Sequence, residues 1–208
     1  MNVTVFGTGP VGRSVATRLV ELTHAVAMGS RHPGNPDAAA WLASVGSHRG
    51  ARVVGLAEAA AHGALLVNAT SAATSVEMLE QAGEPNLHGK VLLDLANPEP
   101  DAVESASLAE RIQERFPNLQ VVKALNMVAP DVMTHPDRLP EETTVFVAGE
   151  DPEAKATVAD LLRSFGWRSI LDLGGIAAAR GMEQYRPLWN ALAAAQGTES
   201  FNLRVVRA

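Results

Sequence analysis

Short hydrophobic runs alternate with longer amphipathic stretches along the whole chain. Most of the runs are continuous and rich in Val and Leu, which is typical of strands covered on both faces of a parallel sheet. Eight runs are predicted to be strands: VTVFG (3–7), AVAM (25–28), RVVGL (52–56), ALLVNAT (64–70), KVLLDLAN (90–97), LQVVKAL (119–125), TVFVAG (144–149) and RSILDLG (168–174).

The segments between these runs carry hydrophobic residues at helical spacing. Arg186 and Pro187 fall inside the last segment, and because proline lacks the N–H of a helix interior, we expect a kink or a new helix start there. Residues 126–142 are rich in Pro, Asp and Met and are expected to be irregular or short-helical. Seven segments are predicted to be helices: 11–22, 36–45, 57–62, 71–81, 107–116, 152–165 and 177–195.

This alternation predicts right-handed βαβ units and an α/β fold of the Rossmann type, a doubly wound, mostly parallel sheet with a short C-terminal α/β extension. The pattern is clearest in residues 1–125, which we assign to a dinucleotide-binding domain. Residues 126–208 form the extension. The extension either completes the sheet as packing or forms a substrate subdomain that contributes an acceptor site or a dimer contact.

A glycine motif follows the first predicted strand directly, because GTGPVG matches the pattern G-x-G-x-x-G. Gly7 would make the tight turn, Gly9 would let the backbone approach a pyrophosphate, and Gly12 would let the helix pack against the strand. The next helix would direct free N–H groups and its positive dipole end at the phosphates. A plain glycine turn is the alternative, but the strand before and the helix after favour a dinucleotide.

Ser30, Arg31 and His32 stand where such domains usually carry an acid, about 20 residues after the glycines. An acid would bind the ribose hydroxyls and repel a 2′-phosphate. Arg31 and Ser30 do the reverse, since a guanidinium binds phosphate in forked geometry and a hydroxyl adds a donor. His32 is a further donor or only a solvated loop residue. The sequence therefore predicts NADP(H) rather than NAD, unless Arg31 is an incidental surface arginine.

Small and polar residues follow three other predicted strands, at the edge where open α/β sheets bind ligands. Each has a local alternative, such as helix capping by Ser71 or turn formation by Asn97 and Pro98. Their succession at consecutive strand ends favours a shared cleft for the nicotinamide and its acceptor. The residues are Asn68, Ala69, Thr70, Ser71, Asn97, Pro98, Ala124 and Asn126.

The composition excludes several other classes of protein. The formal charge is -6, and no basic run occurs that could neutralise nucleic-acid phosphates. The chain has no cysteine for a disulfide, a thiolate nucleophile or a Cys-bound metal, and we predict no metal site. No apolar stretch approaches the roughly 20 residues that span a bilayer, and Met1 leads into a strand without a charged leader. We expect a cytoplasmic protein without membrane or nucleic-acid partners.

A proton-transfer group of the kind that alcohol dehydrogenases use is missing from the pattern. The single tyrosine, Tyr185, has no lysine three or four residues later. No histidine stands at a strand end with an obvious carboxylate partner. We therefore predict no catalytic side chain, which fits hydride transfer between two cofactors, where the protein supplies alignment and exclusion of water.

Several motifs together resemble one family over essentially the whole chain, the coenzyme F420-dependent NADP oxidoreductases. GSRHP is also similar to the nucleotide-binding segment in the cytosolic domain of six-transmembrane metalloreductases. The resemblance implies an NADP-binding Rossmann domain and hydride exchange between NADP(H) and a deazaflavin. The motifs are VFGTGPVG, GSRHP, DLANP, VVKALN, VFVAGEDPEAKATVADLLRSFGW, DLGGIAAARGMEQYRPLWNAL and FNLRVVR.

By position, the resemblance implies that Ser30 and Arg31 hold the 2′-phosphate, and that the strand ends frame the nicotinamide and its acceptor. Met127 replaces a Thr that many relatives carry, so the acceptor surface differs. Pyrophosphate contacts would come from Thr8, Gly9, Pro10 and Val11. Cations for the phosphate and glutamyl tail of F420 would come from Lys123, Arg138, Arg180 or Arg186.

The first hypothesis is hydride transfer between NADPH and F420 or a flavin. Two alternatives stay open: an NADP(H)-binding sensor without turnover, and a reductase of a small carbonyl or imine with Glu183 or Tyr185 as proton donor. The last helical segment has the apolar residues of a core or dimer contact, and we expect a homodimer.

Overall fold

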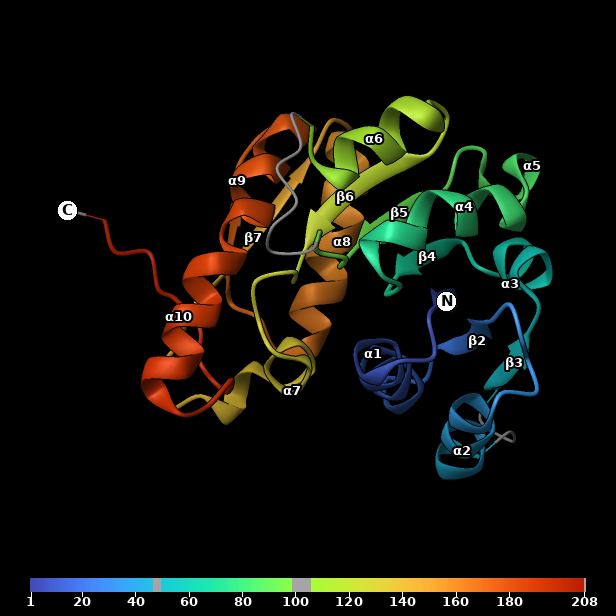
Figure 1. Cartoon of the computed structure of the whole chain (residues 1–208), viewed down its shortest axis with the longest axis horizontal. Coiled ribbons are helices and arrows are strands. Elements are labelled where there is room, and N and C mark those ends of the chain that lie inside the picture. The colour runs from blue at the N-terminus through green and yellow to red at the C-terminus, as the bar shows by residue number, and fades with distance from the viewer. Residues whose placement is uncertain (47–49, 99–105, 208) are drawn as a thin grey trace.

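The computed structural model describes residues 1–46, 50–98 and 106–207, and its centre is an eight-stranded sheet (Figure 1). The strand order is β3-β2-β1-β4-β5-β6-β7-β8. All eight predicted runs form strands. Their bounds are β1 (Asn2–Phe6), β2 (Ala25–Gly29), β3 (Arg52–Val54), β4 (Leu65–Asn68), β5 (Val91–Asp94), β6 (Gln120–Ala124), β7 (Thr144–Gly149) and β8 (Ser169–Asp172).

The first six strands are parallel and follow the order 3-2-1-4-5-6 of the dinucleotide-binding Rossmann fold. Strand β1 pairs with β2 on one side and with β4 on the other, so the chain order switches at β1. Open α/β sheets bind ligands beyond the carboxyl ends of the strands at such a switch. The predicted fold class is confirmed.

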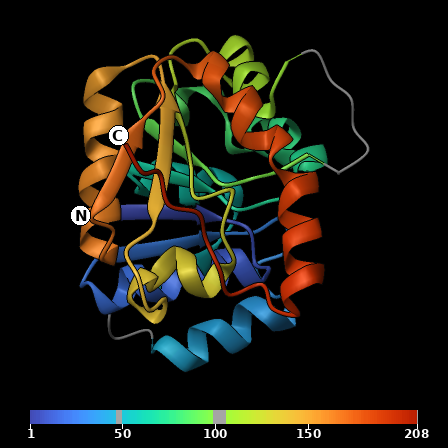
Figure 2. The same ribbon diagram turned by 90° about the vertical axis from the view of Figure 1, so that its left-hand side faces the viewer.

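The sheet changes direction at β7, which pairs antiparallel with β6, while β8 runs parallel to β7. Strand β7 therefore starts at the edge of the sheet where β1 to β6 end. Figure 2 shows helix α8 on one side of these last strands and helices α9 and α10 on the other. The chain after β8 returns along that second side toward the carboxyl ends of the parallel strands.

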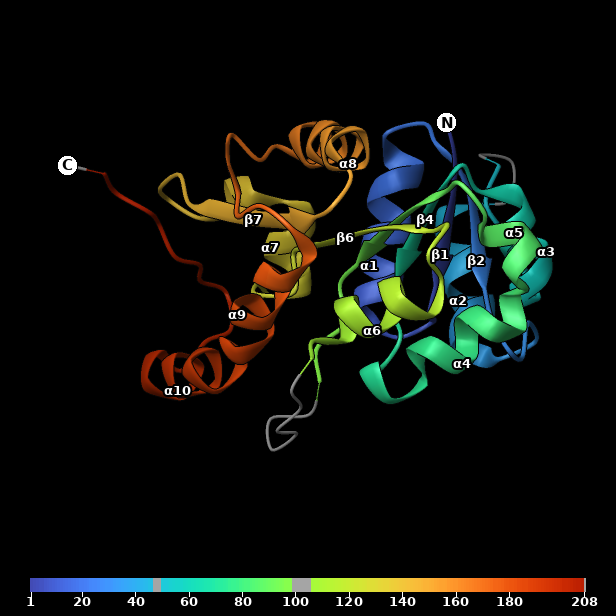
Figure 3. The same cartoon turned by 90° about the horizontal axis from the view of Figure 1, so that it is seen from above.

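Helices cover both faces of the sheet (Figure 3). One hydrophobic core joins the sheet to α1, α2, α7 and α8, and the other joins it to α3, α4, α5, α6 and α9. The bounds are α1 (Pro10–Glu21), α2 (Pro36–Val45), α3 (Leu56–His62), α4 (Ala72–Ala82), α5 (Glu84–Leu87), α6 (Leu108–Arg115), α7 (Pro130–Thr134), α8 (Pro152–Phe165), α9 (Ala179–Gln184) and α10 (Arg186–Gln196), with short 3₁₀ turns η2 (Pro136–Arg138) and η3 (Ile176–Ala178).

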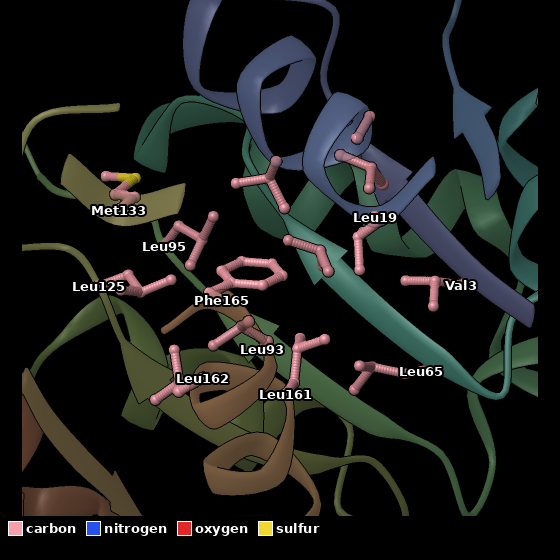
Figure 4. Packing of buried hydrophobic residues seen from close by; sticks show 14 of the residues in the cluster. Val3, Leu19, Leu65, Leu93, Leu95, Leu125, Met133, Leu161, Leu162 and Phe165 are labelled. Atoms are coloured by element: carbon pink, nitrogen blue, oxygen red, sulfur yellow. The ribbon is translucent and has the colours of Figure 1, made fainter. Parts of the chain in front are cut away.

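Phe165 of α8 lies at the centre of the first core, close to Leu93 and Leu95, which belong to β5 and the residues after it (Figure 4). The same core includes Leu19 of α1 and Met133 of α7. Burial of a side chain of this size contributes about 1.5–3 kcal/mol. This packing fixes α1 and α7, which border the ligand-binding edge, against the sheet.

The C-terminal helical segment differs from the single helix predicted over 177–195. It is divided into η3, α9 and α10, and Pro187 stands in the first turn of α10, which agrees with the predicted new helix start. Among the described residues of α10, Trp189 alone is buried. In the part of the chain that the structure describes, no helix has the length and hydropathy to cross a membrane.

Candidate functional site

The turn between β1 and α1 has no room for side chains at two of its three glycines. Gly7 has a φ of +115°, and a Cβ atom there would lie 2.4 Å from the carbonyl oxygen of Ala69. A Cβ atom at Gly12 would lie 2.2 Å from the oxygen of Gly7. At Gly9, the N-cap of α1, a Cβ atom would meet nothing within 4 Å. The backbone at Gly9 is therefore open to a ligand, beside the first N–H groups of α1 that have no helical partner.

Two side chains that the sequence analysis missed brace this turn. Asn35 donates from Nδ2 to the Thr8 hydroxyl (3.0 Å) and caps α2 by accepting from the Ala38 N–H (2.9 Å). Arg13 donates from Nη1 to the carbonyl oxygen of Thr8 (2.7 Å). The Asn-Pro start of α2 indicates the cap, but the bond to Thr8 joins residues 27 positions apart and leaves no sequence signal.

Ser30, Arg31 and His32 follow β2 directly, beside the glycine turn. Ser30 is 8% exposed, its N–H donates to the Val54 carbonyl (3.0 Å), and its hydroxyl accepts from the His32 N–H (3.1 Å). The side chains of Arg31 and His32 are exposed, and Arg31 forms no ion pair with any residue that the structure describes. A guanidinium without a carboxylate partner is thus available next to the turn that approaches phosphate.

A cavity of about 380 Å³ lies beyond the carboxyl ends of β4, β5 and β6. Helix α10 lies across from these ends and contributes Arg186 and Trp189. The predicted site residues that line it are Val11, Ala69, Thr70, Ser71, Asn97, Pro98 and Asn126. Ala96, which precedes Asn97 and Pro98, also lines it. Residues that the sequence did not single out as lining are Leu95, Val128, Ala129, Pro130, Met133, Trp189 and Glu199.

Asn97 and Asn126 form a reciprocal pair that joins the ends of β5 and β6. Asn97 Nδ2 donates to the Asn126 carbonyl (2.7 Å), and Asn126 Nδ2 donates to Asn97 Oδ1 (2.8 Å) and to the Met182 carbonyl of α9 (3.0 Å). Leu125, with a φ of +60°, turns the chain between β6 and this pair. Asn126 Oδ1 is buried at the cavity without a hydrogen-bond partner. It can accept a hydrogen bond from a ligand there.

Two predicted residues lie below the cavity rather than in its wall. Asn68 is fully buried and its Nδ2 donates to Ser75 Oγ (2.9 Å) and Asp94 Oδ1 (2.8 Å). Its Oδ1 accepts from the hydroxyl of Thr70 (2.7 Å), which does line the cavity. Ala124 is buried in the pairing of β6 with β7. Asn68 therefore positions Thr70 instead of contacting a ligand.

The interpretation of Lys123 as a cation for an acceptor tail is wrong. Lys123 is fully buried, and its Nζ forms ion pairs with Asp94 Oδ2 (2.8 Å) and Glu183 Oε1 (2.9 Å) and donates to the Ala96 carbonyl. Lys123 lies near the end of a strand that is covered on both faces. Its side chain points into the core, where the carboxylates of Asp94 and Glu183 neutralise it. Of the other three candidate cations, Arg138 pairs with Asp131, Arg180 pairs with Glu110, and Arg186 lines the cavity.

Neither candidate proton donor lines the cavity. Glu183 accepts at Oε2 from the Leu108 N–H (2.9 Å) and binds Lys123 through Oε1, so both oxygens are engaged. Burial raises the pKa of the Tyr185 hydroxyl, which has no hydrogen-bond partner among the described residues. Among the residues with described positions, no three His, Asp or Glu side chains come together as a metal site.

A solved structure decides the family. The chain is 40% identical to a candidate F420-dependent NADP-reductase from Arthrobacter sp. FB24, with a TM-score of 0.93 and full coverage of both chains. The chain belongs to the coenzyme F420-dependent NADP oxidoreductase family. The sequence pattern of that family, described as "NADP oxidoreductase coenzyme F420-dependent", matches residues 2–98.

Two curated relatives agree with this assignment. The F420-dependent NADP reductase of Methanocaldococcus jannaschii is 27% identical over 88% of this chain and 87% of its own length. Metalloreductase STEAP3 of Rattus norvegicus is 32% identical over 87% of this chain, and the match spans 35% of the metalloreductase. The predicted family and the class of NADP-dependent oxidoreductase are confirmed.

The site of this F420-dependent NADP oxidoreductase family member fits NADP(H). From β2 to β5 the sheet advances by three strand spacings, about 14 Å, which suits an extended dinucleotide. The open backbone at Gly9 fits the pyrophosphate, and Arg31 fits a 2′-phosphate. The unpaired Asn126 Oδ1 fits a donor such as the carboxamide NH₂ of nicotinamide.

Proposed function

We propose that the protein transfers hydride between NADPH and a deazaflavin or flavin-type acceptor, with coenzyme F420 as the first choice. The observation that carries this proposal is the cavity at the ends of β4, β5 and β6. It adjoins the glycine turn at Val11 on one side and is bordered by Arg186 and Trp189 on the other. When bound, NADPH supplies the hydride, and the protein aligns the two rings and excludes water.

Two side chains of helix α10, Arg186 and Trp189, favour a planar, anionic acceptor. The Arg186 guanidinium lies 4.9 Å from the centre of the Trp189 ring, a cation–π arrangement that keeps the cation beside an apolar surface. Trp189 also stacks on Phe201, with 5.7 Å between ring centres. A flat conjugated ring matches the apolar part of the wall, and Arg186 matches an acidic group on the same molecule.

The first test is NADPH oxidation by the purified protein with F420, FMN, FAD and a ferric chelate offered in turn. Turnover with F420 or a flavin supports the proposal. Tight NADPH binding without turnover on any of these acceptors contradicts it and favours the sensor alternative.

Arg31→Ala tests the assignment of the cofactor. Loss of charged hydrogen bonds to a 2′-phosphate costs about 1.5–3 kcal/mol, so NADPH affinity should fall about tenfold or more while NADH affinity stays the same. The measurement is calorimetric titration with each nucleotide. Arg52→Ala, an exposed arginine at the opposite end of the neighbouring strand β3, is the matched control. Equal loss for NADPH and NADH would contradict the role of Arg31.

A reductase of a small carbonyl or imine would need a proton donor at the cavity. Among the described residues that line the cavity, Glu199 is the one carboxylate, and it is exposed. Transfer of hydride to a flavin-type ring does not require Glu199, so kcat of Glu199→Gln should match the wild-type value over the pH range of the assay. A kcat that falls about a hundredfold would favour the carbonyl or imine alternative, since general acids contribute about 10²–10⁴-fold.

A further inference from the structure

The buried ion cluster of Asp94, Lys123 and Glu183 joins three elements beneath the cavity. Asp94 ends β5, Lys123 lies in β6 and Glu183 lies in α9, and all three are 5% exposed or less. The cluster holds two carboxylates and one ammonium. A buried ion pair contributes little net stability compared with apolar side chains of the same size, because desolvation offsets the attraction. The cluster therefore matters to this fold through the elements that it holds together, β5, β6 and α9.

Helix α10 buries little side-chain surface that could hold it by itself. Trp189 is its buried residue among those described, and that ring stacks on Phe201 of the C-terminal segment rather than on the sheet. Tyr185, which separates α9 from α10, has helical φ and ψ of -66° and -21°. The two helices are thus nearly continuous, and the placement of α9 sets the placement of α10 (Figure 1).

The buried polar attachments of α9 come from the end of β6 and from the first turn of α6, where the Leu108 N–H donates to Glu183 Oε2. Lys123 binds Glu183, and Asn126 Nδ2 donates to the Met182 carbonyl. Lys123 Nζ also donates to the carbonyl of Ala96, which lines the cavity. The Lys123 ammonium group therefore contacts Ala96 at the cavity and also α9. Helix α9 continues into α10, which carries the outer wall of the cavity, Arg186 and Trp189.

We infer that the Lys123–Glu183 ion pair sets the width of the acceptor cavity by holding α9, and through it Arg186 and Trp189, over the strand ends. Lys123 and Glu183 are positioning residues in this role. The inference deepens the proposed function, because it rests on the acceptor entering this cavity. The ion pair lies outside the contact surface of both molecules, but its loss should weaken binding of the acceptor and leave binding of the cofactor unchanged.

Glu183→Gln is the decisive variant. The amide oxygen of the substituted side chain can still accept from the Leu108 N–H, and the remaining Asp94–Lys123 pair is electrically balanced, so the fold should persist. We expect faster hydrogen exchange in residues 182–196, unchanged NADPH affinity and kcat, and a KM for the acceptor about tenfold higher. Unchanged exchange in α10, or an equal loss of NADPH and acceptor affinity, would overturn the inference.

Arg163→Ala is the matched control, because it breaks the exposed Arg163–Asp160 pair within α8, which does not line the cavity, and leaves the buried pair intact. Its exchange in α10 and its acceptor KM should equal those of the wild type, and a change as large as that of Glu183→Gln would overturn the inference. Hydrogen exchange needs no acceptor, so it decides the inference even if no acceptor is turned over and the proposed function fails. If Glu183→Gln does not fold, Glu183→Asp, shorter by one methylene, takes its place with the same expected outcomes.

Discussion

Gly7 and Gly9 belong to the same motif, but one glycine is required by the fold and the other by ligand binding. Gly7 has a positive φ and sits against the Ala69 carbonyl, so it is required by the fold. Gly9 has a φ of -73° that any residue adopts and open space where a side chain would stand, so the fold alone does not require it. The glycine at position 9 is explained by the approach of a ligand.

Alanine at each position should separate the two constraints. Gly7→Ala should lower the free energy of unfolding by at least about 2 kcal/mol, from backbone strain and the clash with Ala69. Gly9→Ala should change that free energy by less than about 1 kcal/mol, yet weaken NADPH binding strongly. Urea unfolding and nucleotide titration measure the two effects. Full NADPH affinity in Gly9→Ala would show that the pyrophosphate does not approach there.

The role of a residue can be predicted from the sequence where its distance from a strand determines its place in the site. The glycines, Ser30 and Arg31 stand at set distances from a strand, and the structure places them around the β1–α1 turn and the end of β2. Lys123 was misjudged because its carboxylate partners lie 29 and 60 positions away, and no local pattern marks a lysine as buried. Asn35 and Asn68 act through bonds to other elements and were missed or misplaced for the same reason.

At the level of elements, all eight strands could be predicted because continuous apolar runs have few alternatives in a sheet covered on both sides. The outer wall of the cavity, formed by Arg186 and Trp189 of α10, could not be predicted. It depends on the reversal at β7 and on the return of the chain through α9, which no hydrophobic pattern encodes. The apolar residues of α10 predicted only a core or a dimer contact, although Trp189 lines the cavity.

The link between α6 and α9 gives a pH-dependent prediction. Hydrogen bonds from Arg180 hold the pKa of Glu110 at about 2, below its ordinary value of 4.5. A lowered pKa stabilises the folded state above the unfolded value, and this stabilisation is lost as the pH falls from about 4.5 toward 2. Arg180→Ala should therefore be less stable than the wild type near neutral pH, by a small margin since Arg180 is half exposed, and the difference should vanish near pH 2.

Urea unfolding at a series of pH values measures this difference. Arg163→Ala, which breaks the exposed Arg163–Asp160 pair within α8, is the control and should show a smaller dependence on pH. A constant difference between Arg180→Ala and the wild type from pH 7 to pH 2 would contradict the role assigned to the Glu110 carboxylate.

The whole molecule exposes apolar side chains near its C-terminal end. Leu188 of α10 is 54% exposed, Leu173 is 40% exposed and Val206 is 78% exposed. We expect these residues to be covered in a homodimer. Leu188→Glu should convert the dimer to a monomer in sedimentation velocity, while Ala156→Glu, at an exposed position of α8, should leave it dimeric. A wild-type protein that sediments as a monomer would contradict this prediction.

The reversal of the sheet at β7 also bears on how such a protein changes over evolution. The glycine turn and the residues after β4 and β5 belong to the parallel part of the sheet, whereas Arg186 and Trp189 on the other side of the cavity follow a separate excursion of the chain through β7, α8 and β8. Substitutions in α10 can therefore accumulate without disturbing the phosphate turn. The two sides of the cavity can therefore change independently of each other.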